Sequence, residues 1–443
     1  MTKKPQFPPF HYHRFENGIQ LAAETFDTVQ SVSIGFFFKS GVVSENIKTL
    51  GVSHFIEHML FKGTPKRSAK DIARQFDRIG GYLNAFTAKD YCCFYARVVK
   101  DKLSVAVEIL TDMLKNSLFD ETELERERGV ILEEIKMYED SPDEIIHELL
   151  GQSLMENSPL GRPILGTFKT ISQLPRTDIV GTYNKHYVSS NMMICTAGNL
   201  DWNNLIHLIE KNLHDFRPGS FNPKKISTPY CFQANVYTKK IEQVHVAIGF
   251  PGVSYQSHDR YPLTIINAAF GGGMSSRLFQ EIREKKGLAY SVYSYHTAFK
   301  DSGIFSIYAG TSVEHFPKVL RLISKEIERI SNTGLSKTEI NETKEQLKGN
   351  LLIALESTTN RMNRMVTGFL YDVQPLDAEA SIQPFMEVSA KEISSLSSKI
   401  FDINKMSLSV ISPSEKACET LKNSPFGHLP ISIRNFDSGK LNI

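Results

Sequence analysis

Alternating hydrophobic and polar positions near the start of each half of the chain predict β-strands. In SVSIGFFFKSG (residues 31–41) every second residue from Val32 to Phe38 is apolar, as in a strand with one buried face. VHVAIGFPGVS (residues 244–254) opens the second half in a similar way. The run YCCFYARVV (residues 91–99) is β-branched and aromatic, which also favours a strand.

Two longer segments have the spacing of amphipathic helices. In residues 102–118 apolar side chains from Leu103 to Leu114 recur every three or four positions and share one face. Residues 121–139 show the same spacing within a highly charged sequence. Strands mixed with long helices in both halves predict α+β architecture.

The order of these patterns is repeated, which indicates an internal duplication. DIVGTYNKHYVSSNMMICTAGN begins at Asp178, and EISSLSSKIFDINKMSLSVISP, which matches it in pattern, begins at Glu392, 214 residues later. Between the opening strand and this late segment each half carries a glycine-rich turn, strands and two helical stretches. We therefore predict two duplicated domains, each a mostly antiparallel β-sheet backed by α-helices.

A segment near the midpoint has the composition of a domain linker. Residues 216–230 read FRPGSFNPKKISTPY and are rich in Pro, Gly, Ser and Lys. The predicted boundaries are 1–218 for the N-terminal domain, 219–232 for the linker and 233–443 for the C-terminal domain.

Composition narrows the class of protein. With 443 residues the chain exceeds what one hydrophobic core serves, and 41% hydrophobic and 23% charged residues are ordinary for a globular protein. The net charge of +2 argues against a nucleic-acid partner. Five cysteines without a CxxC pair, no visible signal sequence and no long apolar run predict a cytoplasmic protein without membrane insertion.

The sharpest chemical motif is GVSHFIEHMLFKGT, residues 51–64. We expect Ser53 to cap a helix that places His54 and His58 one turn apart on one face. Glu57 lies about 60° round from His54, at about 100° per residue. Two imidazoles can then bind one zinc ion while the carboxylate faces a water molecule. HxxEH is the inverzincin motif, although a helix with two surface histidines and an ion-paired glutamate would also fit.

A third ligand is expected from ETELERERGVILEEIKMYED, residues 121–140. Glu127 and Glu134 are two helical turns apart on one face, whereas Glu133 points about 100° away from Glu134. One of the pair could bind metal while the other supports a ligating histidine. An ordinary solvated, charged helix face is the alternative.

The HxxEH helix, the GGYLNAFT stretch and the ERxxxxxE helix, in this order, resemble the pitrilysin family of inverzincins. Within it the chain is most similar to short bacterial relatives of the mitochondrial processing peptidase β-subunit. The resemblance implies one zinc ion per chain held by His54, His58 and Glu134, with Glu133 as a minor rival. It also implies that Glu57 is the general base and that Glu127 supports a ligand.

GGYLNAFT (residues 80–87) is expected to form a short strand after a glycine turn. In the family this strand is an exposed edge that pairs with extended substrate, which gives affinity without strong sequence preference. The resemblance therefore implies substrate-binding residues Asn84, Ala85, Phe86 and Thr87. An ordinary hairpin strand is the alternative.

The second half keeps the pattern but has no metal ligands. Aligned with the HxxEH segment, it places Thr264, Asn267 and Ala268 where the first half has His54, Glu57 and His58. Its glycine run is not followed by GK[ST], so a phosphate-binding loop is not supported. In REKKGLAY, Arg283 and Tyr290 resemble the family's pair that steadies the substrate carbonyl. A surface charge on a helix is the alternative for Arg283.

These expectations describe a zinc metalloendopeptidase acting on extended peptides or leader-like segments. Because the chain carries half of the repeats of longer family members, the resemblance implies a homodimer, or a heterodimer with a paralogue, in which Arg283 and Tyr290 act on the partner's zinc site. The alternative is a non-catalytic structural or partner subunit; inactive relatives lose HxxEH residues, and this chain retains all of them.

Overall fold

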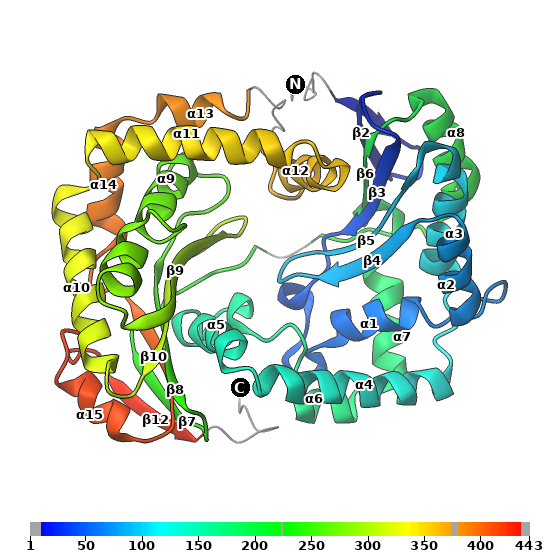
Figure 1. Ribbon diagram of the computed structural model, residues 1–443. Coiled ribbons are helices and arrows are strands. Elements are labelled where there is room, and N and C mark those ends of the chain that lie inside the picture. Colours follow the sequence, from blue (N-terminus) through cyan, green and yellow to red (C-terminus); the bar gives the residue numbers. More distant parts are fainter. Residues whose placement is uncertain (1–9, 223–224, 374–379, 436–443) are drawn as a thin grey trace. The chain divides into compact units, whose positions relative to one another are not determined.

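The computed structural model describes residues 10–222, 225–373 and 380–435. Contacts divide the chain into two units (Figure 1). Unit 1 comprises residues 1–135, 163–225 and 352–379, and unit 2 comprises residues 136–162, 226–351 and 380–443.

Unit 1 is built on a six-stranded sheet with the order β1-β2-β6-β3-β5-β4. The β2–β6 pair is parallel and the other pairs are antiparallel. Its strands are β1 (His11–Arg14), β2 (Gln20–Thr25), β3 (Ser31–Phe38), β4 (Tyr82–Thr87), β5 (Cys92–Val99) and β6 (Met192–Gly198). Its main helices are α1 (Val52–Leu60), α2 (Ala69–Arg78), α3 (Leu103–Asn116), α4 (Glu121–Glu139), α6 (Phe168–Gln173), α7 (Arg176–His186), α8 (Trp202–Leu213) and α12 (Thr358–Leu370).

Unit 2 repeats this plan, with the strand order β12-β7-β11-β8-β10-β9. Its strands are β7 (Ala234–Thr238), β8 (Gln243–Pro251), β9 (Ala289–Ala298), β10 (Gly303–Ser312), β11 (Ser407–Ser412) and β12 (Ile431–Asn435). Its main helices are α5 (Pro142–Leu154), α9 (Arg260–Phe270), α10 (Phe316–Thr333), α11 (Lys337–Ala354), α13 (Gln383–Glu387), α14 (Ala390–Ile400) and α15 (Lys416–Lys422). The predicted duplication is present, because β7, β11, β8, β10 and β9 follow the order of β2, β6, β3, β5 and β4.

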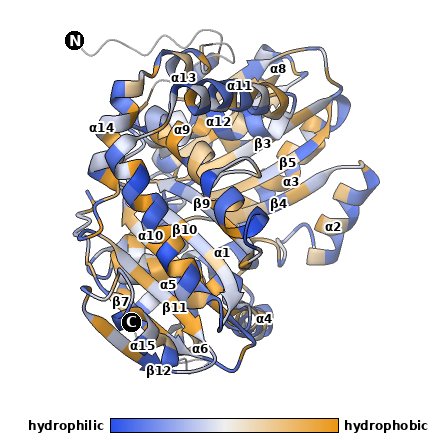
Figure 2. Cartoon of the chain, turned by 60° about the vertical axis from the view of Figure 1, so that its left-hand side comes forward, coloured by the Kyte–Doolittle hydropathy of each residue, from blue (hydrophilic) through white to orange (hydrophobic). Residues whose placement is uncertain are grey.

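Strand alternation sorts side chains onto the two faces of each sheet. In β3 the residues Val32, Ile34, Phe36 and Phe38 enter a core with α1, α3, α7 and α8. On the opposite face the Ser33 hydroxyl hydrogen-bonds to Thr358 of α12. Figure 2 shows the matching pattern on the helices, with hydrophobic and hydrophilic residues alternating around α10. The α+β prediction with mostly antiparallel sheets is confirmed.

The units are not contiguous in sequence. Residues 136–162, which carry the end of α4 and all of α5, belong to unit 2, and residues 352–379, which carry the end of α11 and all of α12, belong to unit 1. Ile145, Ile146 and Leu149 of α5 pack in a core with residues of the unit 2 sheet. The predicted continuous domains, 1–218 and 233–443, do not include this exchange of segments. The chain passes from unit 1 to unit 2 at residues 225–226, inside the predicted linker 219–232, of which residues 223–224 lie outside the described residues.

Within the described ranges no helix is long and apolar enough to cross a membrane.

Candidate metal centre

Helix α1 begins differently from the prediction. Gly51, not Ser53, is the N-cap residue, with φ of 89°, and the helix has no side-chain cap of its own. The Ser53 hydroxyl is buried without a hydrogen-bond partner in the part of the chain that is described. Instead the buried Glu45 carboxylate accepts hydrogen bonds from the Gly51 and Ser53 backbone N–H groups, both at 2.8 Å. The predicted Ser53 cap is therefore wrong, and the cap comes from the preceding loop.

The structure brings His54, His58 and Glu134 together. One potential ligand atom from each lies within 4.8 Å of the others. Glu134 Oε2 is 3.8 Å from His54 Nε2 and 3.7 Å from His58 Nε2. Tetrahedral zinc with bonds of about 2.0–2.2 Å requires donors roughly 3.4 Å apart, and the two distances from Glu134 Oε2 exceed this value by only a few tenths of an ångström. Neighbouring Glu133 is exposed and is not part of this group.

The protonation state of His54 suits a metal ligand. Burial, together with the smaller effect of the nearby His58, lowers the pKa of His54 to about 3. The imidazole is therefore neutral at pH 7, as zinc ligation requires. A donor set of two imidazoles and one carboxylate is that of catalytic zinc sites, in which a water molecule takes the fourth position.

Glu127 and Lys62 fix the orientation of His58. The Glu127 carboxylate is buried; its Oε2 lies 3.0 Å from His58 Nδ1 and its Oε1 lies 2.6 Å from Lys62 Nζ. With Nδ1 bonded to a carboxylate, Nε2 of His58 is left to face Glu134. The sequence pointed to Glu127 but not to Lys62, whose position four residues after His58 was the available signal.

Glu57 lies beside the cluster without joining the ligand group. Burial raises the pKa of Glu57, against the lowering effects of a hydrogen bond from Thr87 and of the nearby His58. A carboxylate with a raised pKa is a better proton acceptor near neutral pH than an exposed one. The arrangement therefore places a carboxylate of raised pKa next to three potential zinc ligands.

The predicted substrate strand is the edge strand β4, and its side chains divide between two faces. Ala85 packs against the unit 1 core, and Thr87 Oγ1 donates to Glu57 Oε2 at 2.6 Å. Asn84 is exposed and donates to the Tyr82 hydroxyl at 2.7 Å, while the Phe86 ring lies 5.6 Å from that of Tyr91.

Arg283 and Tyr290 belong to unit 2. The Arg283 guanidinium lies 4.8 Å from the centres of both the Phe279 and the Tyr290 rings, at the π-helix η6 (Phe279–Glu284). Tyr290 is 76% exposed, so its hydroxyl is accessible. The Thr264, Asn267 and Ala268 positions lie in α9 and offer no metal-ligand set.

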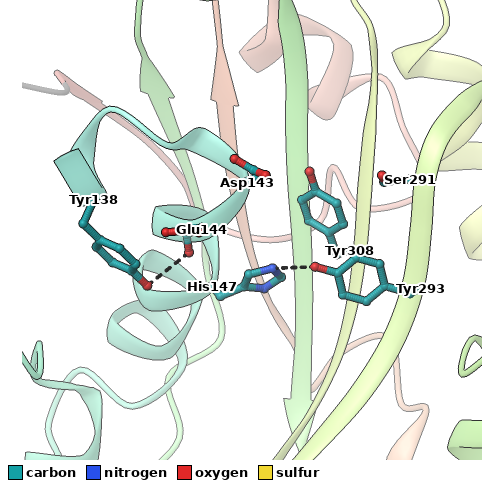
Figure 3. A pocket seen from close by; sticks show the side chains of 7 residues that line it. All are labelled: Tyr138, Asp143, Glu144, His147, Ser291, Tyr293 and Tyr308. Carbon is teal, nitrogen blue, oxygen red and sulfur yellow. Dashed lines mark hydrogen bonds between the residues drawn. The ribbon is translucent and has the colours of Figure 1, made fainter. Parts of the chain in front are cut away.

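Unit 2 contains a cavity that the sequence did not predict, with a volume of about 440 Å³ (Figure 3). His147 hydrogen-bonds to the hydroxyls of Tyr293, at 2.9 Å, and Tyr295, at 2.8 Å. Burial lowers the pKa of His147 to about 4, so the ring is neutral at pH 7. The lining combines acidic and aromatic residues, and both kinds of side chain favour the binding of a cationic group. The lining residues are Tyr138, Asp143, Glu144, His147, Ser291, Tyr293 and Tyr308.

Family models match both halves of the chain. Residues 21–168 match "Insulinase (Peptidase family M16)", and residues 173–347 match "Peptidase M16 inactive domain". The second description agrees with the missing ligands in the second half.

Curated relatives cover nearly the whole chain. The chain is 38% identical to "Uncharacterized zinc protease YmxG" of Bacillus subtilis, over 90% of this chain and 97% of the relative. It is 37% identical to "Uncharacterized zinc protease SCO5738" of Streptomyces coelicolor, over 89% of this chain and 88% of that one.

Solved structures share the fold. A protease from Helicobacter pylori superposes with a TM-score of 0.85 at 19% identity, covering 92% of this chain and 100% of its own. A peptidase M16 inactive domain from Pseudomonas fluorescens gives 0.86 at 19% identity, covering 91% and 98%. Together with the family models and the curated relatives, these matches show that the chain belongs to peptidase family M16.

Proposed function

We propose that this chain is a zinc-dependent endopeptidase that cleaves extended peptides or leader-like segments. The observation that carries the proposal is the convergence of His54, His58 and Glu134 within 4.8 Å, in a chain whose relatives are named zinc proteases. One zinc ion per chain is expected at this cluster. When bound, zinc lowers the pKa of water toward about 7 and polarises a carbonyl oxygen.

The chain's own residues divide the remaining work. Glu57 takes a proton from the attacking water and delivers it to the departing amine, as a general base and then a general acid. Glu127 holds His58 by its Nδ1, which keeps Nε2 directed at Glu134. Both proposed roles are supported by the positions of these residues within unit 1.

Strand β4 is the proposed site of substrate pairing. It ends the strand order of the unit 1 sheet and pairs with β5 on one side only, from Tyr82 to Thr87. An extended peptide can add to such an edge through backbone hydrogen bonds, which bind many sequences. The exposure of Asn84, on the face of β4 opposite the core, supports a role in side-chain contacts with that peptide.

The proposal is tested with purified protein and a mixed peptide library. Wild type should cleave internal bonds, lose activity to a chelator and regain it with zinc. Glu57→Gln should retain zinc and lose at least about 100-fold in kcat, because general-base catalysis contributes about 10²–10⁴-fold. A zinc-loaded wild type that cleaves nothing would support the alternative, a non-catalytic partner subunit.

We also propose that the enzyme works as a cytoplasmic homodimer, or as a heterodimer with a paralogue, in which Arg283 and Tyr290 serve the partner's zinc site. Subunit mixing tests the shared site. Glu57→Gln and Tyr290→Phe homodimers should each be nearly inactive, whereas mixed dimers hold one intact site and should regain about half of the wild-type activity. If mixed dimers form but regain nothing, the pair does not act across the dimer.

A further inference from the structure

Thr87 ends β4 and reaches the proposed general base. Its Oγ1 donates a hydrogen bond of 2.6 Å to Glu57 Oε2. The two residues are 30 positions apart in sequence, and helix α1 and strand β4 bring them together. This contact involves the Thr87 side chain, whereas the predicted pairing with substrate involves the backbone of β4.

Strand alternation explains why Thr87 faces α1. Leu83, Ala85 and Thr87 share one face of β4, and the first two pack against the unit 1 core. Asn84 and Phe86 lie on the other face, where the Phe86 ring is 6.3 Å from that of Tyr95. A substrate pairing with the edge of β4 would therefore meet the strand's backbone, while the Thr87 hydroxyl remains bonded to Glu57.

A glutamate side chain without such a bond has several accessible rotamers, and a base is effective only in the one that reaches the reacting water. Thr87 occupies one carboxylate oxygen of Glu57 and leaves Oε1 as the oxygen for the proton. The bond to an ionised acceptor is of the stronger, charge-assisted kind.

We infer that Thr87 is a positioning residue that holds the Glu57 carboxylate in its proton-accepting orientation. The inference rests on the proposed function, since it assigns Glu57 the role of base. It also links two parts of the site: β4 pairs with substrate through its backbone and orients the base through its last side chain. A peptide bound along the edge of β4 would then restrict the motion of Thr87 and, through the hydrogen bond, that of Glu57.

The kinetic test uses two variants, one that removes the Thr87 hydroxyl and one that keeps it. Thr87→Val removes the hydroxyl at nearly constant volume and should lower kcat about 10- to 30-fold, which corresponds to about 1.4–2 kcal/mol, with little change in KM. Thr87→Ser restores a hydroxyl and should recover most of kcat. The matched control is Thr25→Val, at the exposed end of β2, which should behave as wild type. Equal kcat for Thr87→Val and wild type would overturn the inference, as would a loss that appears in KM alone.

Two further readouts do not depend on activity. The zinc dissociation constant of Thr87→Val, from chelator competition, should match that of wild type, because Thr87 is not in the ligand group. In crystal structures of the zinc-loaded proteins, Glu57 should be ordered in wild type and Thr87→Ser and spread over several conformers in Thr87→Val. An unchanged, single Glu57 conformer in Thr87→Val would overturn the inference even if no peptide is cleaved, whereas an inactive wild type by itself counts against the proposed function.

Discussion

The cap that Glu45 provides to α1 yields a quantitative prediction. The Glu45 side chain is buried, and its two oxygens accept the Gly51 and Ser53 N–H groups at 2.8 Å each. In Glu45→Ala both N–H groups of the helix that carries His54 and His58 lose their acceptor. A helix start that is buried without partners is costly, because no other residue of the turn replaces the cap.

The magnitude follows from the two bonds. A hydrogen bond to a charged group contributes about 1.5–3 kcal/mol, so two give about 3–6 kcal/mol. Water that enters the space left by the side chain should bond to the freed N–H groups in part. We therefore expect Glu45→Ala to lower the free energy of unfolding by about 3 kcal/mol, the lower end of this range. Glu45→Gln keeps the volume and one acceptor oxygen, and should lose roughly half as much.

The assay is urea unfolding of the zinc-free protein, followed by circular dichroism. Ser68→Ala is the comparison, because the exposed Ser68 caps α2 and the loss of this cap should cost only about 1 kcal/mol. Zinc affinity should also fall in Glu45→Ala, because His54 directly follows Ser53, whose N–H group Glu45 holds. A Glu45→Ala protein as stable as Ser68→Ala, with unchanged zinc affinity, would refute the assignment of the cap to Glu45.

Three other predictions concern separate residues. Glu127→Gln should weaken zinc binding about 10- to 100-fold by chelator competition, because it loosens the hold on His58 Nδ1; unchanged affinity would count against this role. Burial lowers the pKa of His186 to about 4. The stability that its neutral ring contributes is therefore complete above pH 6.5 and is lost as the pH falls toward 4, by up to about 3 kcal/mol. In His186→Asn the free energy of unfolding should decline less steeply over this range, and an equally steep decline would contradict the assignment. All five cysteines are free thiols, four of them buried, so alkylation under non-reducing denaturation should label five, and fewer would reveal a disulfide.

Periodicity predicted the position of the regular elements well, although β3, expected to have one buried face, is buried on both faces because α12 covers the second. The helix predicted over residues 121–139 is α4, Glu121–Glu139, and the strand predicted over 91–99 is β5, Cys92–Val99. The HxxEH spacing could be read because residues four apart share a helix face.

What the sequence could not supply depends on tertiary placement. The apolar face of α5, with Ile145, Ile146 and Leu149, predicts that the helix packs on a sheet, but the pattern does not say which of the two sheets it covers. The hydrogen bonds from Gly51 to Glu45 and from Thr87 to Glu57 depend on the paths of a loop and a strand, and no short sequence motif predicts them. A hydroxyl at position 53 looked like a cap only because the helix start was placed too late.

The most direct test of the account is the zinc content of two adjacent glutamine variants. Glu134 belongs to the ligand group with His54 and His58, whereas Glu133 is exposed on the same helix and does not. Metal analysis after dialysis should find about one zinc per chain in wild type and in Glu133→Gln, and little in Glu134→Gln. Full zinc in Glu134→Gln, or equal loss from both variants, would contradict the proposed metal centre.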